Sequence, residues 1–343
     1  MITKILKIWT SLILLGFLLL GLIILIPVNY KVEPPTKREN TQYWQLNTGS
    51  KIGYFKIEAK SLQKKNPIIY LHGGPGGRIK DDVIETLKPL ASLGYDLYFY
   101  DQVGSGYSNR LEDISEYTVK RHQEDLNEII AKTKSEQVIL IAQSWGACLA
   151  INYLQDFSQK VEKIILTGPG PILPINKKIK TIKPPDTLSL IEPEFTNKQG
   201  NEKVDTWRSR LILKWAYFFK TKLAGDQEVD HFFAILNQEL VKSTTCNGTP
   251  HHKLEGGLGY YSHIMTLKSF QEVDDKRRQL KKLDIPILIL RGQCDNQKWG
   301  FTKEYLDLFS NSSLAIIRGV GHKLINGAKE EYYELIEQFL IEN

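Results

Sequence analysis

Residues 138–150 read VILIAQSWGACLA, and they place one serine, Ser144, between a run of β-favouring aliphatic residues and a helix start made of small residues. In a G-x-S-x-G turn, a serine at this position is a nucleophile exposed at the edge of a sheet. The residues two before and two after it must be small because the sharp turn brings strand and helix backbones together, and Ala142 and Gly146 meet this condition. The alternative is a serine that only caps the helix.

The same change from strand to helix recurs along the chain. Six short apolar runs are separated by segments of helical spacing, such as residues 119–133 and 329–341. Because the runs are apolar on both faces, we expect a mostly parallel, doubly wound sheet buried between two helical layers. Residues 41–59 alternate polar and apolar side chains, as an antiparallel hairpin does. The six runs are PIIYLHGG (67–74), YDLYFYDQ (95–102), QVILIAQS (137–144), EKIILTGPG (162–170), IPILILRG (285–292) and SLAIIRGVG (313–321).

The pattern of alternating strands and helices stops between the fourth and fifth runs, over roughly residues 171–270. Apolar side chains recur there at helical spacing behind a possible N-cap at Asp226. We expect a helical cap insertion whose apolar stripe packs on the sheet edge and, in an alternative reading, also lines a cavity beneath it. The stripe consists of Val229, Phe232, Phe233, Leu236 and Leu240.

The N-terminus differs in kind from the rest of the chain. Between Lys7 and Lys31 lie 23 uncharged residues, mostly Leu and Ile. At about 1.5 Å per residue such a helix is long enough to cross a hydrocarbon layer of about 30 Å. No small-residue cleavage site follows, so we expect an uncleaved, single-pass membrane anchor, with the catalytic part outside the cytoplasm.

These patterns divide the chain into four predicted parts. They are a membrane anchor with its flanks (1–31), a first part of the α/β core (32–170), a helical cap insertion (171–270) and a second part of the core (271–343).

Charge and cysteine content exclude several classes of function. Half of the net charge of +6 lies in the first 40 residues, beside the predicted anchor, and the rest is too small for a nucleic-acid-binding surface. Cys148, Cys246 and Cys294 cannot all pair, and their spacing is typical of neither a zinc site nor a disulfide framework. We therefore expect no metal, no organic cofactor and no nucleic-acid partner, and the oligomeric state stays open.

A serine nucleophile needs a base to take its proton and an acid to orient that base. Asp295 follows one buried run and His322 follows the next, 27 residues later. Because parallel strands deliver their carboxyl ends to one edge of a sheet, we expect both side chains to lie near Ser144. The alternative is that His322 is a histidine in a surface loop without a catalytic role.

Glycines follow the first buried run, in YLHGGPGG at 70–77. Such residues let backbone N–H groups face a substrate oxygen without obstruction. We expect the N–H of Gly74 to join that of Trp145 as an oxyanion hole. A phosphate-binding loop is excluded because no Gly-Lys-Ser/Thr sequence follows.

These motifs together resemble the α/β-hydrolase superfamily, in particular its proline iminopeptidase-like branch of serine peptidases. The resemblance rests on HGGPGG (72–77), YDQVGSGYS (100–108), AQSWG (142–146) and the loops of Asp295 and His322. It implies an α/β-hydrolase fold, a triad of Ser144, Asp295 and His322, and release of N-terminal residues such as proline from short peptides through an acyl-enzyme.

Two features depart from that branch. Val103 stands where the branch has arginine in its D-Q-R-G pattern, and the insertion lacks the branch's acidic cap motif. A substrate with a free ammonium group still needs a carboxylate partner, because an unpaired buried charge is costly. The available candidates are Glu192, Glu194, Asp230 and Glu255.

Two alternatives to the peptidase stay open at this point. An aromatic insertion near a membrane is also compatible with an esterase or lipase acting on small or lipid-derived acyl esters. The third possibility is a hydrolase-like protein that binds a ligand without turnover.

Overall fold

The computed structural model describes residues 2–36, 38–248 and 254–342. Within these residues eight strands form one sheet, in the order β1-β2-β4-β3-β5-β6-β7-β8. β2 pairs antiparallel with β1 and β4, and all other neighbours are parallel, so the predicted hairpin and mostly parallel sheet are confirmed. The strands are β1 (Gln42–Gln45), β2 (Lys51–Ile57), β3 (Ile68–Leu71), β4 (Leu97–Tyr100), β5 (Val138–Gln143), β6 (Val161–Thr167), β7 (Ile287–Cys294) and β8 (Ser312–Gly321).

The described residues also form α-helices and short 3-10 helices. The α-helices are α1 (Ile2–Leu25), α2 (Asp81–Leu87), α3 (Val119–Lys132), α4 (Trp145–Phe157), α5 (Asn197–Val204), α6 (Trp207–Phe219), α7 (Asp226–Leu240), α8 (Tyr260–Ser269), α9 (Arg277–Leu280), α10 (Trp299–Leu308) and α11 (Lys329–Glu342). The short 3-10 helices are η1 (Lys88–Leu93), η2 (Ile114–Glu116), η3 (Ser158–Lys160), η4 (Lys177–Thr181), η5 (Asp186–Leu188), η6 (Val241–Thr244) and η7 (Leu324–Asn326).

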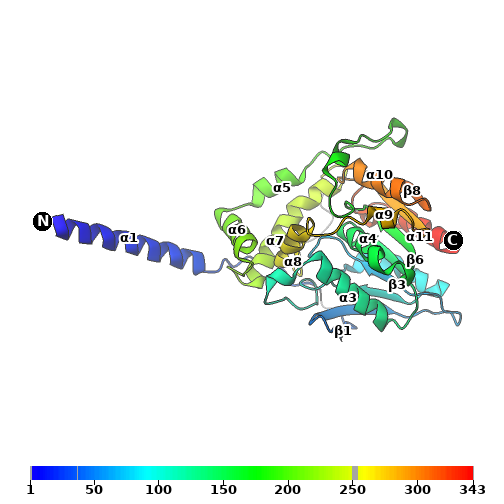
Figure 1. Ribbon diagram of the computed structural model, residues 1–343, viewed down its shortest axis with the longest axis horizontal. Helices are drawn as coiled ribbons and strands as arrows, with labels where there is room; N and C mark the ends of the chain where they lie inside the picture. The colour runs from blue at the N-terminus through cyan, green and yellow to red at the C-terminus, as the bar shows by residue number, and fades with distance from the viewer. Residues whose placement is uncertain (1, 37, 249–253, 343) are drawn as a thin grey trace.

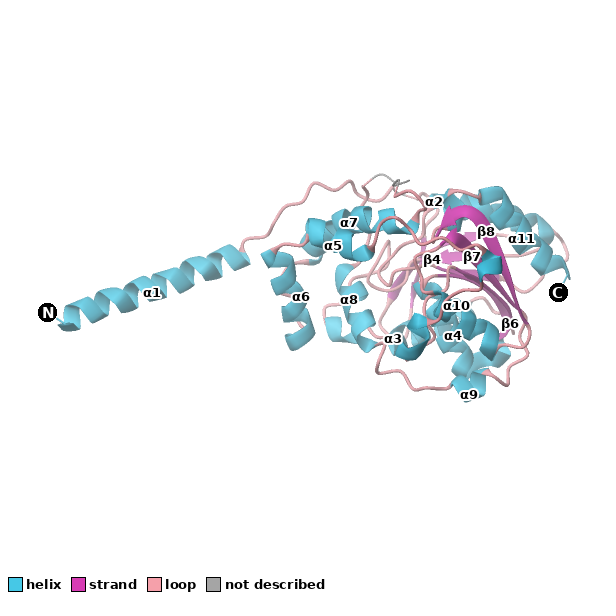
Figure 2. Ribbon diagram, turned by 90° about the horizontal axis from the view of Figure 1, so that it is seen from above, coloured by secondary structure: helices cyan, strands magenta, loops and turns pink. Residues whose placement is uncertain are grey.

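The sheet is buried on both faces. Figure 2 shows α2 and α11 over one face and α3 and α4 over the other. Alternate side chains of a strand point to opposite faces. In β5, Leu140 and Ala142 accordingly join the core cluster beneath α3 and α4, while Ile139 and Ile141 join the cluster beneath α2 and α11. This two-sided burial explains why the strands read as continuous apolar runs.

Helices α5 to α8 follow β6 in the chain, within the predicted insertion. On α7, Val229, Phe232 and Phe233 are buried, as the apolar stripe predicts. Phe233 and Leu240 also line a cavity, so the stripe serves both packing and cavity lining. One detail of the prediction is wrong, because the residue that caps α7 is Gly225 and Asp226 is already its first helical residue.

Helix α1 extends away from the rest of the molecule, on the side opposite the C-terminus (Figure 1). The side chains at positions 2–5, 17–20, 22, 23 and 25 lie outside the described residues. Among the residues that are described, we find no helix with both the length and the apolar character needed to cross a membrane. The predicted membrane anchor is therefore not confirmed.

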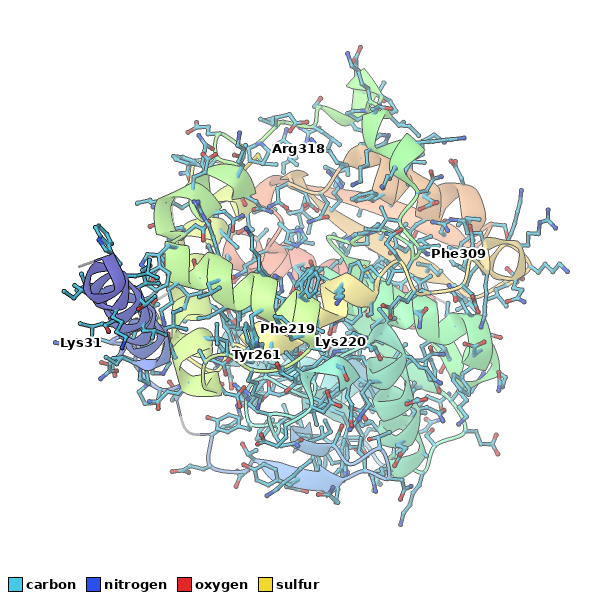
Figure 3. All side chains as sticks on the ribbon, turned by 60° about the vertical axis from the view of Figure 1, so that its left-hand side comes forward. Lys31, Phe219, Lys220, Tyr261, Phe309 and Arg318 are labelled. Carbon is cyan, nitrogen blue, oxygen red and sulfur yellow. A yellow bond between two sulfur atoms is a disulfide. The ribbon has the colours of Figure 1, made fainter. Side chains whose placement is uncertain are left out.

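The last turn of α1 is held by the helices of the insertion. Arg208 Nη1 of α6 donates a hydrogen bond to the carbonyl oxygen of Ile24 at 2.6 Å. Figure 3 looks from this side and shows Lys31 near α1, with Phe219 and Lys220 at the end of α6 and Tyr261 of α8 in the helical layer. The N-terminal segment thus packs against the same helices that cover the sheet edge.

Cys246 and Cys294 form a disulfide, which the cysteine spacing did not predict. Cys148 is a free, buried cysteine, consistent with a packing role. The bond joins the segment after η6 to the last residue of β7, and these two positions are 48 residues apart. Sequence spacing misses this pair because only the tertiary contact between insertion and sheet brings the two sulfurs together.

Reduction of this disulfide should destabilise the protein. Closing a loop of this length restricts the unfolded chain, so we expect the double variant C246S/C294S to lose about 2–4 kcal/mol of unfolding free energy. Urea denaturation with and without dithiothreitol measures the loss. The reductant should lower the midpoint of the wild type and leave that of C246S/C294S unchanged. A wild-type midpoint insensitive to reductant would contradict a structural disulfide.

Candidate functional site

Ser144 sits on a sharp turn between β5 and α4. Its backbone has φ of 55° and ψ of −113°, a conformation that residues with a side chain rarely adopt. A Cβ on Gly146 would clash with the carbonyl oxygen of Leu71, at the end of β3. The small residue that the motif requires two positions after the serine is therefore needed because α4 begins directly against β3.

Asp295 and His322 follow the ends of β7 and β8. The two atoms His322 Nδ1 and Asp295 Oδ1 are 2.9 Å apart, and both residues are buried. The same carboxylate oxygen accepts the N–H of Gln297 at 2.9 Å. Arg291 donates from Nη2 to the Asp295 carbonyl at 3.2 Å, which holds the loop that carries the acid.

The carboxyl group of Asp295 is kept ionised by its surroundings. Burial by itself raises its pKa, but the charge and hydrogen bond of His322, the charge of Arg291 and the Gln297 N–H together bring the pKa below its ordinary value. A carboxylate that stays charged can hold the imidazole in one orientation and stabilise its protonated form.

Ser144 and His322 line the same cavity, which has a volume of about 270 Å³. The end of β6 brings them together. The Ser144 N–H donates to the carbonyl oxygen of Thr167 at 3.0 Å, and the next residue, Gly168, lies so close to the His322 ring that a Cβ would be 2.8 Å from Nδ1. In the described part of the chain no hydrogen bond joins the Ser144 hydroxyl to His322. In substrate-free enzymes the hydrogen bond between a nucleophile and its base is often long and tightens when substrate binds.

The glycine-rich loop after β3 lines the cavity beside the serine. A Cβ on Gly73 would be 2.7 Å from Gln143 Oε1 and 3.1 Å from the Cβ of Ser144, so a side chain at this position would force its neighbours to shift. Among the described residues, neither the N–H of Gly74 nor that of Trp145 donates to an acceptor. Gly74 lines the cavity, whereas Trp145 is not among its lining residues.

Gln102 is a residue whose role the sequence did not reveal. Its backbone N–H donates to His72 Nε2 at 3.0 Å, and its side-chain Nε2 donates to the His72 carbonyl at 2.9 Å. Its Oε1 accepts the indole N–H of Trp145 at 2.7 Å. Gln102 therefore ties the glycine-rich loop to the first residue of α4. Its position directly after a predicted strand was the available signal.

None of the four carboxylates considered for a substrate ammonium lines the cavity. Asp230 is buried and accepts from Arg110 Nε at 2.9 Å and from the Tyr260 N–H at 2.8 Å. Glu255 pairs with Arg78. The remaining two, Glu192 and Glu194, are exposed in the loop before α5. Within the described residues no group of three or more His, Cys, Asp or Glu side chains is arranged to hold a metal ion.

Comparisons with known proteins agree with this architecture. The family model for the alpha/beta hydrolase fold matches residues 66–324. A proline iminopeptidase from Saccharolobus solfataricus is 24% identical over 294 residues, covering 84% of this chain and 88% of that protein. A proline iminopeptidase from Lactobacillus delbrueckii subsp. lactis is 26% identical, covering 84% and 94% respectively. Among solved structures, an esterase from Exiguobacterium antarcticum matches with a TM-score of 0.57 at 19% identity, covering 87% of this chain and 98% of that one. The esterase shares the fold.

Replacing Gln102 should destabilise the site. Gln102→Leu leaves the buried indole N–H of Trp145 and the His72 carbonyl without partners, at about 1–3 kcal/mol each. We expect a loss of about 2 kcal/mol or more in unfolding free energy by urea denaturation. Gln137→Leu is the matched control, because its side-chain hydrogen bond to Gln159 is exposed. Equal losses in the two variants would show that Gln102 has no special structural role.

Proposed function

This chain belongs to the α/β-hydrolase family and is a hydrolase, and we propose that Ser144, His322 and Asp295 work in it as a catalytic triad. The observation that carries the proposal is the His322–Asp295 hydrogen bond of 2.9 Å on the cavity that Ser144 also lines. A serine on a strained turn, a histidine and a buried carboxylate in this order match the pattern of the family.

The proposed reaction proceeds through an acyl-enzyme. His322 takes the proton of the Ser144 hydroxyl while its oxygen attacks the substrate carbonyl, and the N–H groups of Gly74 and Trp145 stabilise the negative oxygen. The carbonyl bond to the leaving group breaks, and His322 returns the proton to that group. Water then attacks the acyl-enzyme with His322 again as base, which releases the acid and restores Ser144. Asp295 holds His322 throughout.

The first proposed substrate class is a short peptide or aminoacyl compound cleaved after its N-terminal residue. The proline iminopeptidases that match over 84% of the chain support this class. A cavity of about 270 Å³ accommodates a small acyl group rather than a folded protein.

A second candidate is an ester with a small acyl group. The lining of the cavity favours it, because the described lining residues include a single carboxylate, that of Asp82, and none of the four acidic residues considered for an ammonium group. A substrate without a positive charge has no need of such a partner.

The Cys246–Cys294 disulfide supports folding of this hydrolase in an oxidising compartment, since cytosolic proteins keep their thiols reduced. An oxidising compartment agrees with a catalytic part that lies outside the cytoplasm, and we include this location in the proposal.

The catalytic proposal is tested by steady-state kinetics. We expect release of 4-nitroaniline from prolyl- or alanyl-4-nitroanilide, or of 4-nitrophenol from short-chain acyl esters, and its loss in Ser144→Ala. Asp295→Asn should lower kcat by about 10³-fold or more, because the imidazole loses its orienting partner. Asp307→Asn, an exposed carboxylate paired with Lys303, is the control.

The substrate series separates the candidates. Preference for aminoacyl anilides supports the peptidase, and preference for acyl esters supports the esterase. Wild-type turnover no higher than that of Ser144→Ala, with every substrate, would contradict catalysis and favour a binding protein.

A further inference from the structure

The cavity that holds Ser144 is lined by three cationic side chains, those of Arg78, Lys80 and Lys323. Arg78 is neutralised, because it forms an ion pair with Glu255. The two lysines differ from it. Within the described part of the chain, neither lysine makes an ion pair or donates a hydrogen bond through Nζ. The cavity wall thus carries two amino groups without partners.

Burial makes these two charges costly. It lowers the pKa of Lys323 to about 7, with a further contribution from the charge of Lys80. Burial likewise lowers the pKa of Lys80 to about 8, with a further contribution from Arg78. The negative charge of Asp82 raises the pKa of both lysines, and that of Glu255 also raises the pKa of Lys80. Neither carboxylate is within ion-pair distance of these lysines. An unpaired ammonium group in a partly desolvated cavity either loses its proton, as the lowered pKa values indicate, or is stabilised by an anion.

The two lysines come from neighbouring elements beside the proposed base. Lys80 directly precedes α2, Lys323 directly follows His322 and precedes η7, and α2 packs against η7. The two lysines therefore come from elements that pack together, and the charge of Lys80 acts on Lys323.

We propose that Lys80 and Lys323 form a subsite for a negatively charged group, a carboxylate or a phosphate, carried by the substrate of this hydrolase. The inference rests on the proposed function, and it names the class of substrate that the same site selects. It favours the ester candidate over the aminoacyl one, because the two amino groups, when protonated, would repel a free N-terminal ammonium.

The test compares esters of matched size. The 4-nitrophenyl monoester of glutaric acid carries a terminal carboxylate, and 4-nitrophenyl valerate is its neutral counterpart with the same number of acyl carbons. The corresponding ester of 4-phosphonobutyric acid distinguishes a phosphate-like group from a carboxylate. We expect kcat/KM for at least one charged ester to exceed that for the neutral ester by about tenfold or more.

Variants assign the preference to the two lysines. Lys80→Met and Lys323→Met should each reduce the charged-to-neutral ratio of kcat/KM by about tenfold. Lys323→Arg should keep most of the ratio because it keeps the charge, and Asp82→Asn should raise it. Lys329→Met, an exposed lysine at the start of α11, is the matched control and should leave the ratio unchanged.

The outcomes distinguish this inference from the catalytic proposal. Hydrolysis of the neutral ester without any preference for either charged one, or a preference that survives the double variant K80M/K323M, overturns the anion subsite and leaves the triad intact. If no ester is hydrolysed, the ester candidate fails and the subsite is judged by binding instead. Calorimetric titration of the full chain with glutarate and with inorganic phosphate then decides: binding weakened tenfold in K80M/K323M supports the subsite, and no binding, or equal binding by that variant, overturns it.

Discussion

The close approach of α4 to β3 is the constraint on which the site depends. The helix begins so near the end of the strand that Gly146 has no room for a side chain against the Leu71 carbonyl. Ser144 must then turn the chain with a positive φ, and this turn lifts its hydroxyl onto the cavity. The glycine-rich loop after β3 lies against the same turn. One packing contact therefore positions both the proposed nucleophile and the proposed oxyanion groups. Gln102 secures that contact through His72 and Trp145.

The insertion contacts the loops that carry the proposed acid, Asp295, and the proposed base, His322. Ser243 of η6 accepts a hydrogen bond from Asn296 Nδ2 at 3.0 Å, next to the proposed acid. Gly321, which directly precedes His322, packs against the carbonyl of Thr244 so closely that a Cβ would not fit. The disulfide fixes this segment to β7 one residue before Asp295. The acid and base loops are therefore held by the helical insertion as well as by the sheet.

Much of this organisation follows from local sequence. Strands buried on both faces read as apolar runs, and the chain order of Ser144, Asp295 and His322 already places all three at one sheet edge. The features that sequence did not reveal depend on long-range contacts. The Cys246–Cys294 pair needs the insertion folded onto the sheet, and the bonds of Gln102 need two loops to meet. The same limit applies to charge. The sequence contains Glu255 and Lys323, but it does not show that Glu255 is paired with Arg78 or that Lys323 lines the cavity without a partner.

The central claim is that the Ser144 hydroxyl is activated by His322 on this cavity. Its most direct measurement is the rate and position of covalent labelling of the native protein by a fluorophosphonate, mapped by peptide mass spectrometry. We expect a single modification at Ser144 in the native protein, lost on unfolding in urea and at least about a hundredfold slower in His322→Gln. A native protein that is not labelled at Ser144, or that is labelled equally fast without the imidazole, would contradict the account.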